Sequence, residues 1–156
     1  MSEGDKTRLI AWSRELRAVH ERLREALRAT REALDAGDSA VPATRDLLLY
    51  CHGFCTALAG HHEGEDAELF PAIAAQHPEL RDTLGRLKQD HSMIAYLVSG
   101  LQEAVERSAS PAELDRRIEG IAAIMESHFR YEERRLLTVL ETLALDADPQ
   151  RVLGPL

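Results

Sequence analysis

The chain has 156 residues, enough for about one domain with its own buried core. Its 27 acidic residues outnumber the 19 lysines and arginines, and the net charge of −8 excludes nucleic acid as the main partner because the phosphates would be repelled. With only 6 prolines and 9 glycines, the composition favours helices over a sheet.

No segment of the sequence has the features of an export signal or of a membrane span. The first residues, 1–6, are polar, and the longest apolar stretch, 47–60, is too short to cross a membrane and contains His52. We therefore expect a cytoplasmic protein with no membrane partner, folded as a single domain over residues 1–156. The sequence leaves the oligomeric state open.

Four amphipathic stretches, with apolar residues three or four positions apart, predict four helices. The predicted helices cover about residues 6–36, 44–75, 79–108 and 111–145. Gly37 and Pro42 stop the first helix, Pro71 should kink or end the second, and Ser110 should cap the fourth. The tail, 146–156, is expected to be irregular. Short connections favour an all-α fold, an up-down-up-down antiparallel four-helix bundle.

A histidine interrupts the apolar stripe of every predicted helix, and two of these histidines are followed by a glutamate one helical turn later. The residues concerned are His20, His61, Glu65, His91, His128 and Glu132. Buried imidazoles need hydrogen-bond partners and buried carboxylates need a countercharge, so six such residues in one core are unfavourable without a cation. The pattern predicts a metal centre in the core of the bundle.

The histidine after His61 allows a second register, because His62 and Asp66 repeat the four-residue spacing. The large side chain of Phe54, compared with the smaller Cys55, favours the register that turns His61 inward. In that register His62 is a neighbour of the site.

Mixed imidazole and carboxylate ligands suit iron, manganese or zinc better than copper(I) or calcium. Six candidate ligands exceed the needs of one tetrahedral zinc, whereas two carboxylates able to bridge and four imidazoles fit a pair of metal ions. No histidine has a glutamate three positions before it, which distinguishes the chain from ferritin-like di-iron proteins.

From about residue 9 to 145 the chain resembles the hemerythrin-like, or HHE cation-binding, family. The matching motifs are His20 with Leu23, His61-His62-x-x-Glu65-Asp66-x-x-Leu69-Phe70-Pro71, Asp90-His91, and His128-Phe129-x-x-Glu132-Glu133. The resemblance implies a four-helix bundle around a non-haem di-iron centre, two iron ions bridged by oxide or hydroxide, that binds dioxygen or related small ligands. It makes His20, His61, His91 and His128 terminal ligands, with Glu65 and Glu132 as bridging carboxylates.

The chain departs from the oxygen-carrying hemerythrins at two points. Those carriers have a second histidine on the third helix where this chain has Ala95, which leaves a coordination position open, filled by water or filled by another side chain. The side chains that could fill it are Tyr96, Tyr131, His62 and Glu133. The carriers also space the last pair by five residues, which would make Glu133 the bridge, whereas the apolar stripe favours Glu132.

An open coordination position shifts the expected function from oxygen carriage to ligand chemistry. The leading hypothesis is a di-iron protein that binds or processes dioxygen, hydrogen peroxide or nitric oxide in sensing or detoxification. The alternatives are a di-iron oxidase or oxygenase acting on an organic substrate, and a non-enzymatic oxygen- or iron-binding module. Whether the chain is an enzyme, catalase-like or an oxidase, is left open by the sequence.

Overall fold

The computed structural model describes residues 10–35 and 45–154, with side chains from Leu49 onward in the second range. The expected first turn of the first helix and the turn at Gly37 lie outside these ranges. The helices are α2 (Trp12–Asp35), α3 (Arg45–Gly64), the π-helix η1 (Glu65–Leu69), α4 (Phe70–Gln76), the 3-10 helix η2 (Pro78–Leu80), α5 (Arg81–Glu106), α6 (Pro111–Leu140) and α7 (Pro149–Leu153). No strand occurs in the described ranges, so the predicted all-α class is confirmed.

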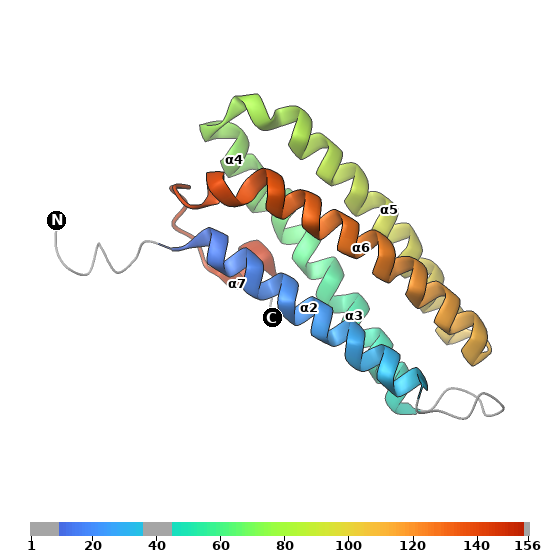
Figure 1. The fold of residues 1–156 in the computed structure, drawn as a ribbon. Helices are drawn as coiled ribbons and strands as arrows, with labels where there is room; N and C mark the ends of the chain where they lie inside the picture. The colour runs from blue at the N-terminus through green and yellow to red at the C-terminus, as the bar shows by residue number, and fades with distance from the viewer. Residues whose placement is uncertain (1–9, 36–44, 155–156) are drawn as a thin grey trace.

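The four long helices α2, α3, α5 and α6 lie side by side, and Figure 1 shows that successive ones run in opposite directions. Helix α2 contacts α3 and α6, and α5 contacts the same two helices, so the core is enclosed by all four. The apolar stripes read from the sequence face this core: Leu23 of α2, Leu58 of α3, Leu87 of α5 and Ile121 of α6 are all fully buried.

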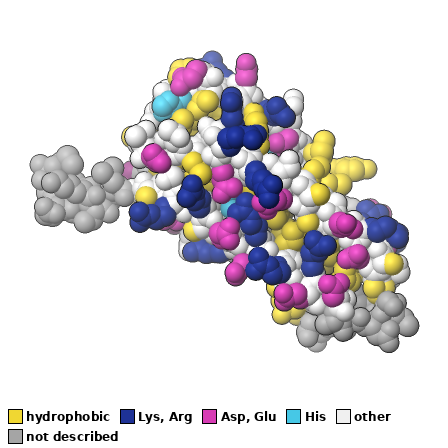
Figure 2. Space-filling model, viewed as in Figure 1, with side chains coloured by type: hydrophobic (Ala, Val, Ile, Leu, Met, Phe, Trp, Pro, Cys, Tyr) yellow, Lys and Arg dark blue, Asp and Glu magenta, His cyan; other side chains and the backbone are white. Residues whose placement is uncertain are grey.

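Charged side chains occupy the outer faces of the helices. Figure 2 shows acidic and basic groups intermingled on the face where α2 and α6 lie in front. No helix within the described part of the chain is long and apolar enough to cross a membrane.

The second predicted helix is interrupted before Pro71 rather than at it. Its helix hydrogen bonding changes at Glu65, where one π-helical turn begins, and the Phe70 N–H donates to the Glu65 carbonyl. Pro71 then lies in the first turn of α4, directly after the π-turn, and the helix continues to Gln76. A π-turn is a frequent mark of a functional position, and here it starts at a predicted metal ligand.

The fourth helix ends at Leu140, five residues earlier than predicted, while its predicted cap is confirmed. The Ser110 Oγ accepts the Glu113 N–H at 3.2 Å. Beyond Leu140, the Gln76 side chain donates to the Ala144 carbonyl at 2.8 Å and accepts its N–H at 3.2 Å. These bonds satisfy the N–H and carbonyl groups of Ala144, which have no helical partners where the chain turns back towards α3.

The prediction of an irregular tail after residue 146 is wrong, because the tail contains α7. The Asp148 Oδ1 accepts the Gln150 N–H at 3.0 Å and caps this short helix. Val152 and Leu153 are buried against the rest of the protein, so burial of two apolar side chains holds the tail in place.

Helix α7 packs directly on the backbone of α3. A Cβ atom added to Gly64 would lie 2.4 Å from the Val152 carbonyl oxygen. Gly154 has a positive φ of +95°, and a Cβ there would lie 2.9 Å from the His61 amide nitrogen. Only glycine permits both approaches, so these two positions fix the tail against the segment that carries His61.

Replacing Gly64 with alanine should therefore destabilise the protein, although alanine is the better helix former. We expect Gly64→Ala to lose about 1–3 kcal/mol in the free energy of unfolding, because α7 must move away. Gly53→Ala, at a helical position of α3 with open space around it, should gain up to about 1 kcal/mol. Denaturant unfolding measures both, and equal stabilisation by the two variants would contradict the docking of α7.

Candidate metal centre

Seven buried side chains from the four long helices and η1 converge in the core. The structure brings together all six residues predicted from the sequence and adds one more histidine. The cluster consists of His20, His61, His62, Glu65, His91, His128 and Glu132.

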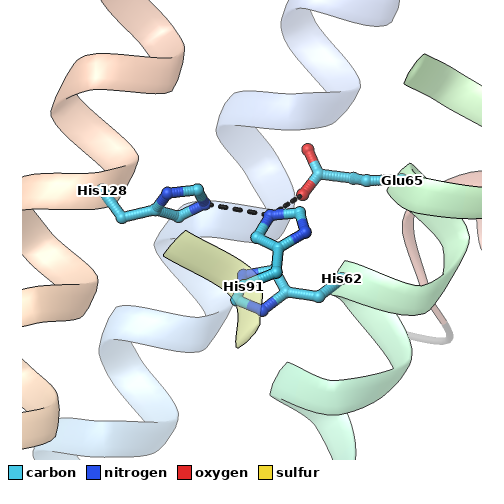
Figure 3. A group of neighbouring side chains, drawn as sticks. All are labelled: His62, Glu65, His91 and His128. Atoms are coloured by element: carbon cyan, nitrogen blue, oxygen red, sulfur yellow. Dashed lines mark hydrogen bonds and ion pairs between the residues drawn. The ribbon is translucent and has the colours of Figure 1, made fainter. Parts of the chain in front are cut away.

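The cluster divides into two groups, in each of which one ligand atom per residue lies within 4.8 Å of the others. The three-residue group contains His20, His61 and Glu132. The four-residue group, drawn in Figure 3, contains His62, Glu65, His91 and His128. Each group has the composition of a site for a divalent transition-metal ion.

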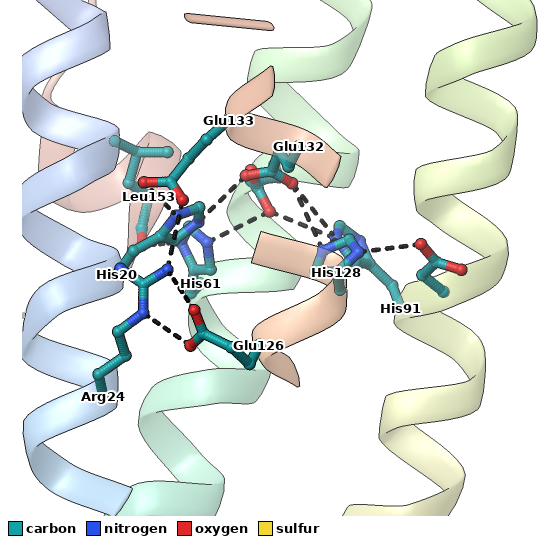
Figure 4. Close-up of polar contacts among 11 residues, drawn as sticks. His20, Arg24, His61, His91, Glu126, His128, Glu132, Glu133 and Leu153 are labelled. Carbon is teal, nitrogen blue, oxygen red and sulfur yellow. Dashed lines mark hydrogen bonds and ion pairs between the residues drawn. The ribbon is translucent and has the colours of Figure 1, made fainter. Parts of the chain in front are cut away.

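The carboxylate of Glu132 reaches both groups. Its Oε1 is 3.2 Å from the His20 Nε2, and its Oε2 is 3.4 Å from the His128 Nε2 (Figure 4). The neighbouring Glu133 approaches only the far side of His20, at 3.7 Å from Nδ1. Of the two candidate bridges, Glu132 is the one that lies between the groups.

The carboxylate of Glu65 has the same intermediate position. Its Oε1 is 3.3 Å from the His61 Nε2 of the three-residue group and 3.3 Å from the His91 Nε2 of the four-residue group. Two carboxylates that each touch histidines of both groups have the arrangement in which carboxylates link a pair of cations.

The protons of His91 and His128 are placed by two aspartates. The His91 Nδ1 lies 2.8 Å from Asp66, and the His128 Nδ1 lies 3.1 Å from Asp90. A carboxylate accepts, so both Nδ1 atoms carry a proton, and in the neutral form of each ring the Nε2 atom presents a lone pair. These two Nε2 atoms are only 3.1 Å apart. Facing lone pairs repel, and a cation that both can ligate removes the repulsion.

The histidines of the three-residue group have oxygen atoms near their outer nitrogens too, although only His61 makes a hydrogen bond there. The His61 Nδ1 donates to the Leu153 carbonyl of α7 at 2.8 Å, which directs Nε2 towards the cluster. Beside His20 lies Glu133, whose other oxygen is 3.3 Å from the Arg24 guanidinium (Figure 4). Sequence reasoning missed the role of Leu153, because a backbone carbonyl acceptor has no residue signature.

Eight buried atoms of the cluster have no hydrogen-bond partner among the described residues. They are both ring nitrogens of His20, the Nε2 atoms of His61 and His62, and both oxygens of Glu65 and Glu132. Each unsatisfied buried polar atom destabilises the fold by about 1–3 kcal/mol, so this number is hard to retain without a ligand for them. The donor set fits a metal ion, which would bond to these atoms directly.

Burial keeps His61 and His62 in the neutral form that binds metals, whereas, although burial opposes it, the Glu132 carboxylate raises the pKa of His20 and His128. Burial lowers the pKa of His61 to about 3 and holds the pKa of His62 well below its usual value. Burial, with the nearby charge of Glu132, raises the pKa of Glu65 well above its usual value. Although burial opposes its ionisation, the close imidazoles of His128 and His20 hold the pKa of Glu132 well below the ordinary range. Two adjacent carboxylates cannot both ionise without added positive charge.

His62 belongs to the four-residue group and not merely to its surroundings. Its ring stacks on that of His91, with the centroids 3.8 Å apart. Helix α3 lies between α2 and α5, so two successive residues can face different groups, His61 towards α2 and His62 towards α5. The sequence-based prediction assumed one apolar stripe on this helix, and one stripe allows only one of the two adjacent histidines to face inward.

The other side chains considered for the position left by Ala95 lie elsewhere. Tyr96 is 78% exposed and points into solvent. Tyr131 lies under the guanidinium of Arg86, 4.7 Å from ring centroid to Cζ. His62 is therefore the candidate that joins the histidines of α5 and α6.

Comparison with known proteins agrees with this arrangement. The model of one protein family, described as the hemerythrin HHE cation binding domain, matches residues 13–140, a range that contains all seven cluster residues. Searches of curated proteins and of solved structures gave no match. The match spans most of the chain and confirms the resemblance seen in the sequence, so the chain belongs to the hemerythrin HHE cation-binding family.

Proposed function

We propose that the chain is a non-haem di-iron protein that binds or processes a small ligand, dioxygen, hydrogen peroxide or nitric oxide, in sensing or detoxification. The observation that carries the proposal is the pair of histidine groups linked by two carboxylates, Glu65 and Glu132. Bound iron would supply redox chemistry and Lewis acidity at this position. The chain supplies a site in the core between the four long helices.

The proposed ligands divide unequally between the two ions. One iron would be held by His20 and His61, and the other by three imidazoles, with the two carboxylates shared. The second set is His62, His91 and His128. His62 replaces the imidazole absent at Ala95, so the centre has five imidazoles rather than four. The iron held by two imidazoles would have fewer protein donors than the other, and would therefore be the one with room for an exogenous ligand.

The iron content and the spectrum test this proposal directly. Protein purified in air should contain two iron ions per chain and absorb as a bridged ferric pair, with bands that shift when azide or hydrogen peroxide is added. Less than about one iron per chain, together with absence of these bands, would refute the di-iron assignment.

Metal removal should destabilise the chain because the cluster atoms lose their ligand. At a free metal concentration of a hundred times Kd, binding adds about 2.7 kcal/mol to the free energy of unfolding. A chelator should remove this increment from the unmodified protein. It should remove the same amount from the control variant His52→Ala, because His52 is exposed on α3 and lies outside the cluster. In His61→Ala, on the same helix, the chelator should lower the free energy of unfolding much less, because this variant lacks one of the metal ligands. A chelator-independent unfolding curve for the unmodified chain would contradict the site.

The bridging role of Glu132 can be separated from the role of its neighbour. Glu132→Ala should abolish binding of most of the iron, because this carboxylate contacts histidines of both groups. Glu133→Ala removes only contacts with His20 and Arg24, so it should retain both ions with weaker affinity. Iron per chain measures the difference, and the reverse ranking would make Glu133 the bridge.

Oxidation of an organic substrate is the second candidate function. The observation that favours it is a groove between α3 and α5 that reaches His62 and His91. Such a groove can hold an organic molecule beside the four-residue group.

A further inference from the structure

The groove between α3 and α5 has the size and lining of a small-molecule site. Its volume is about 580 Å³, within the range of ligand pockets. Buried apolar side chains form its floor, including Leu58, Ile94 and Val98. Several side chains at its edges are short, and two of these, Ala59 and Ala95, are exposed. Small residues at these positions leave the floor open to solvent.

One wall of the groove is His62, the histidine of the cluster whose outer nitrogen, Nδ1, has neither a hydrogen-bond acceptor nor a carboxylate beside it among the described residues. The other four rings have an oxygen beside Nδ1, from Leu153, Asp66, Asp90 or Glu133. The His62 Nε2 is buried and has no hydrogen-bond partner among the described residues, whereas its Nδ1 is not among the buried atoms. Histidines that ligate metals almost always donate their other N–H to an acceptor. For His62 that acceptor has to come from outside the described protein atoms.

The charge of the groove restricts what can supply this acceptor. Two carboxylates, Glu63 and Asp66, lie in its wall, and no lysine or arginine does so among the described residues. An anion would be repelled, and a cation without a lone pair could not accept the His62 proton. Because the floor of the groove is apolar, the molecule that binds there needs an apolar part to cover it.

We propose that this groove binds an uncharged organic molecule with an apolar body and an acceptor oxygen, which accepts the His62 Nδ1–H. The binding itself depends only on the groove. Its coupling to the metal centre rests on the proposed function, in which His62 ligates iron through Nε2. Completing the outer hydrogen bond strengthens His62 as a ligand, so the molecule in the groove and the iron favour each other's binding.

Three eight-carbon probes with different head groups test the chemistry. Calorimetry on the purified chain should show that 2-octanone binds about tenfold more tightly than octanoate, which is repelled, or octylammonium, which lacks an acceptor. Equal affinities for the three probes, or no binding of 2-octanone because water alone fills the groove, would overturn the proposal.

Variants on α5 locate the binding. Ala95→Leu puts a larger side chain at an exposed edge of the groove and should weaken 2-octanone binding at least about tenfold. Gln89→Leu, an exposed position on the same helix outside the groove, is the matched control and should bind as the unmodified chain does. Unchanged binding in Ala95→Leu would place the probe elsewhere and refute the site.

Loss of iron to a chelator measures the coupling. In the unmodified chain and in Gln89→Leu, 2-octanone should slow this loss, and in Ala95→Leu it should not. Selective 2-octanone binding to a chain that holds no iron would refute the proposed function and leave the groove assignment intact. A chain with two irons and no selective binding would refute the groove alone.

Discussion

Two carboxylates in the core, Glu65 and Glu132, have no hydrogen bond to any of their four oxygens among the described residues, and imidazoles from different helices surround them. Each carboxylate alone would favour protonation or escape to solvent. Here the packing of four amphipathic helices keeps both inside. The remaining arrangement of the cluster follows from this constraint, because every lone pair directed at the centre requires a shared positive charge.

The protein controls the centre mainly from outside the ligand set. Asp66 and Asp90 hold the protons of two rings on their outer nitrogens, and the Leu153 carbonyl does the same for His61. These acceptors differ in exposure: the two aspartates reach the surface, while the carbonyl is buried. The four-residue group is thus connected to solvent through its outer partners, whereas His61 of the three-residue group is connected to the interior through Leu153.

The periodicity of the apolar stripes was sufficient to predict the helical class and to bring six cluster residues together, because a histidine on a buried stripe has to face the core. The same reasoning could not place His62, since it assumed that α3 has a single buried face. It could not predict the π-turn at Glu65 either, because a change in helix hydrogen bonding has no residue code. The tail was misjudged because its packing depends on close backbone contact at Gly64 and Gly154, which only tertiary structure reveals.

The contact between His61 and Leu153 also orders events during synthesis. The two residues are separated by 92 positions, so the ribosome makes the histidine long before its acceptor. While α7 is still inside the ribosomal tunnel, the His61 ring has no fixed tautomer and the backbone of α3 at Gly64 is uncovered. Both groups also need α6, which is made just before α7, so the centre is completed only late in synthesis and the His61–Leu153 contact is among the last to form.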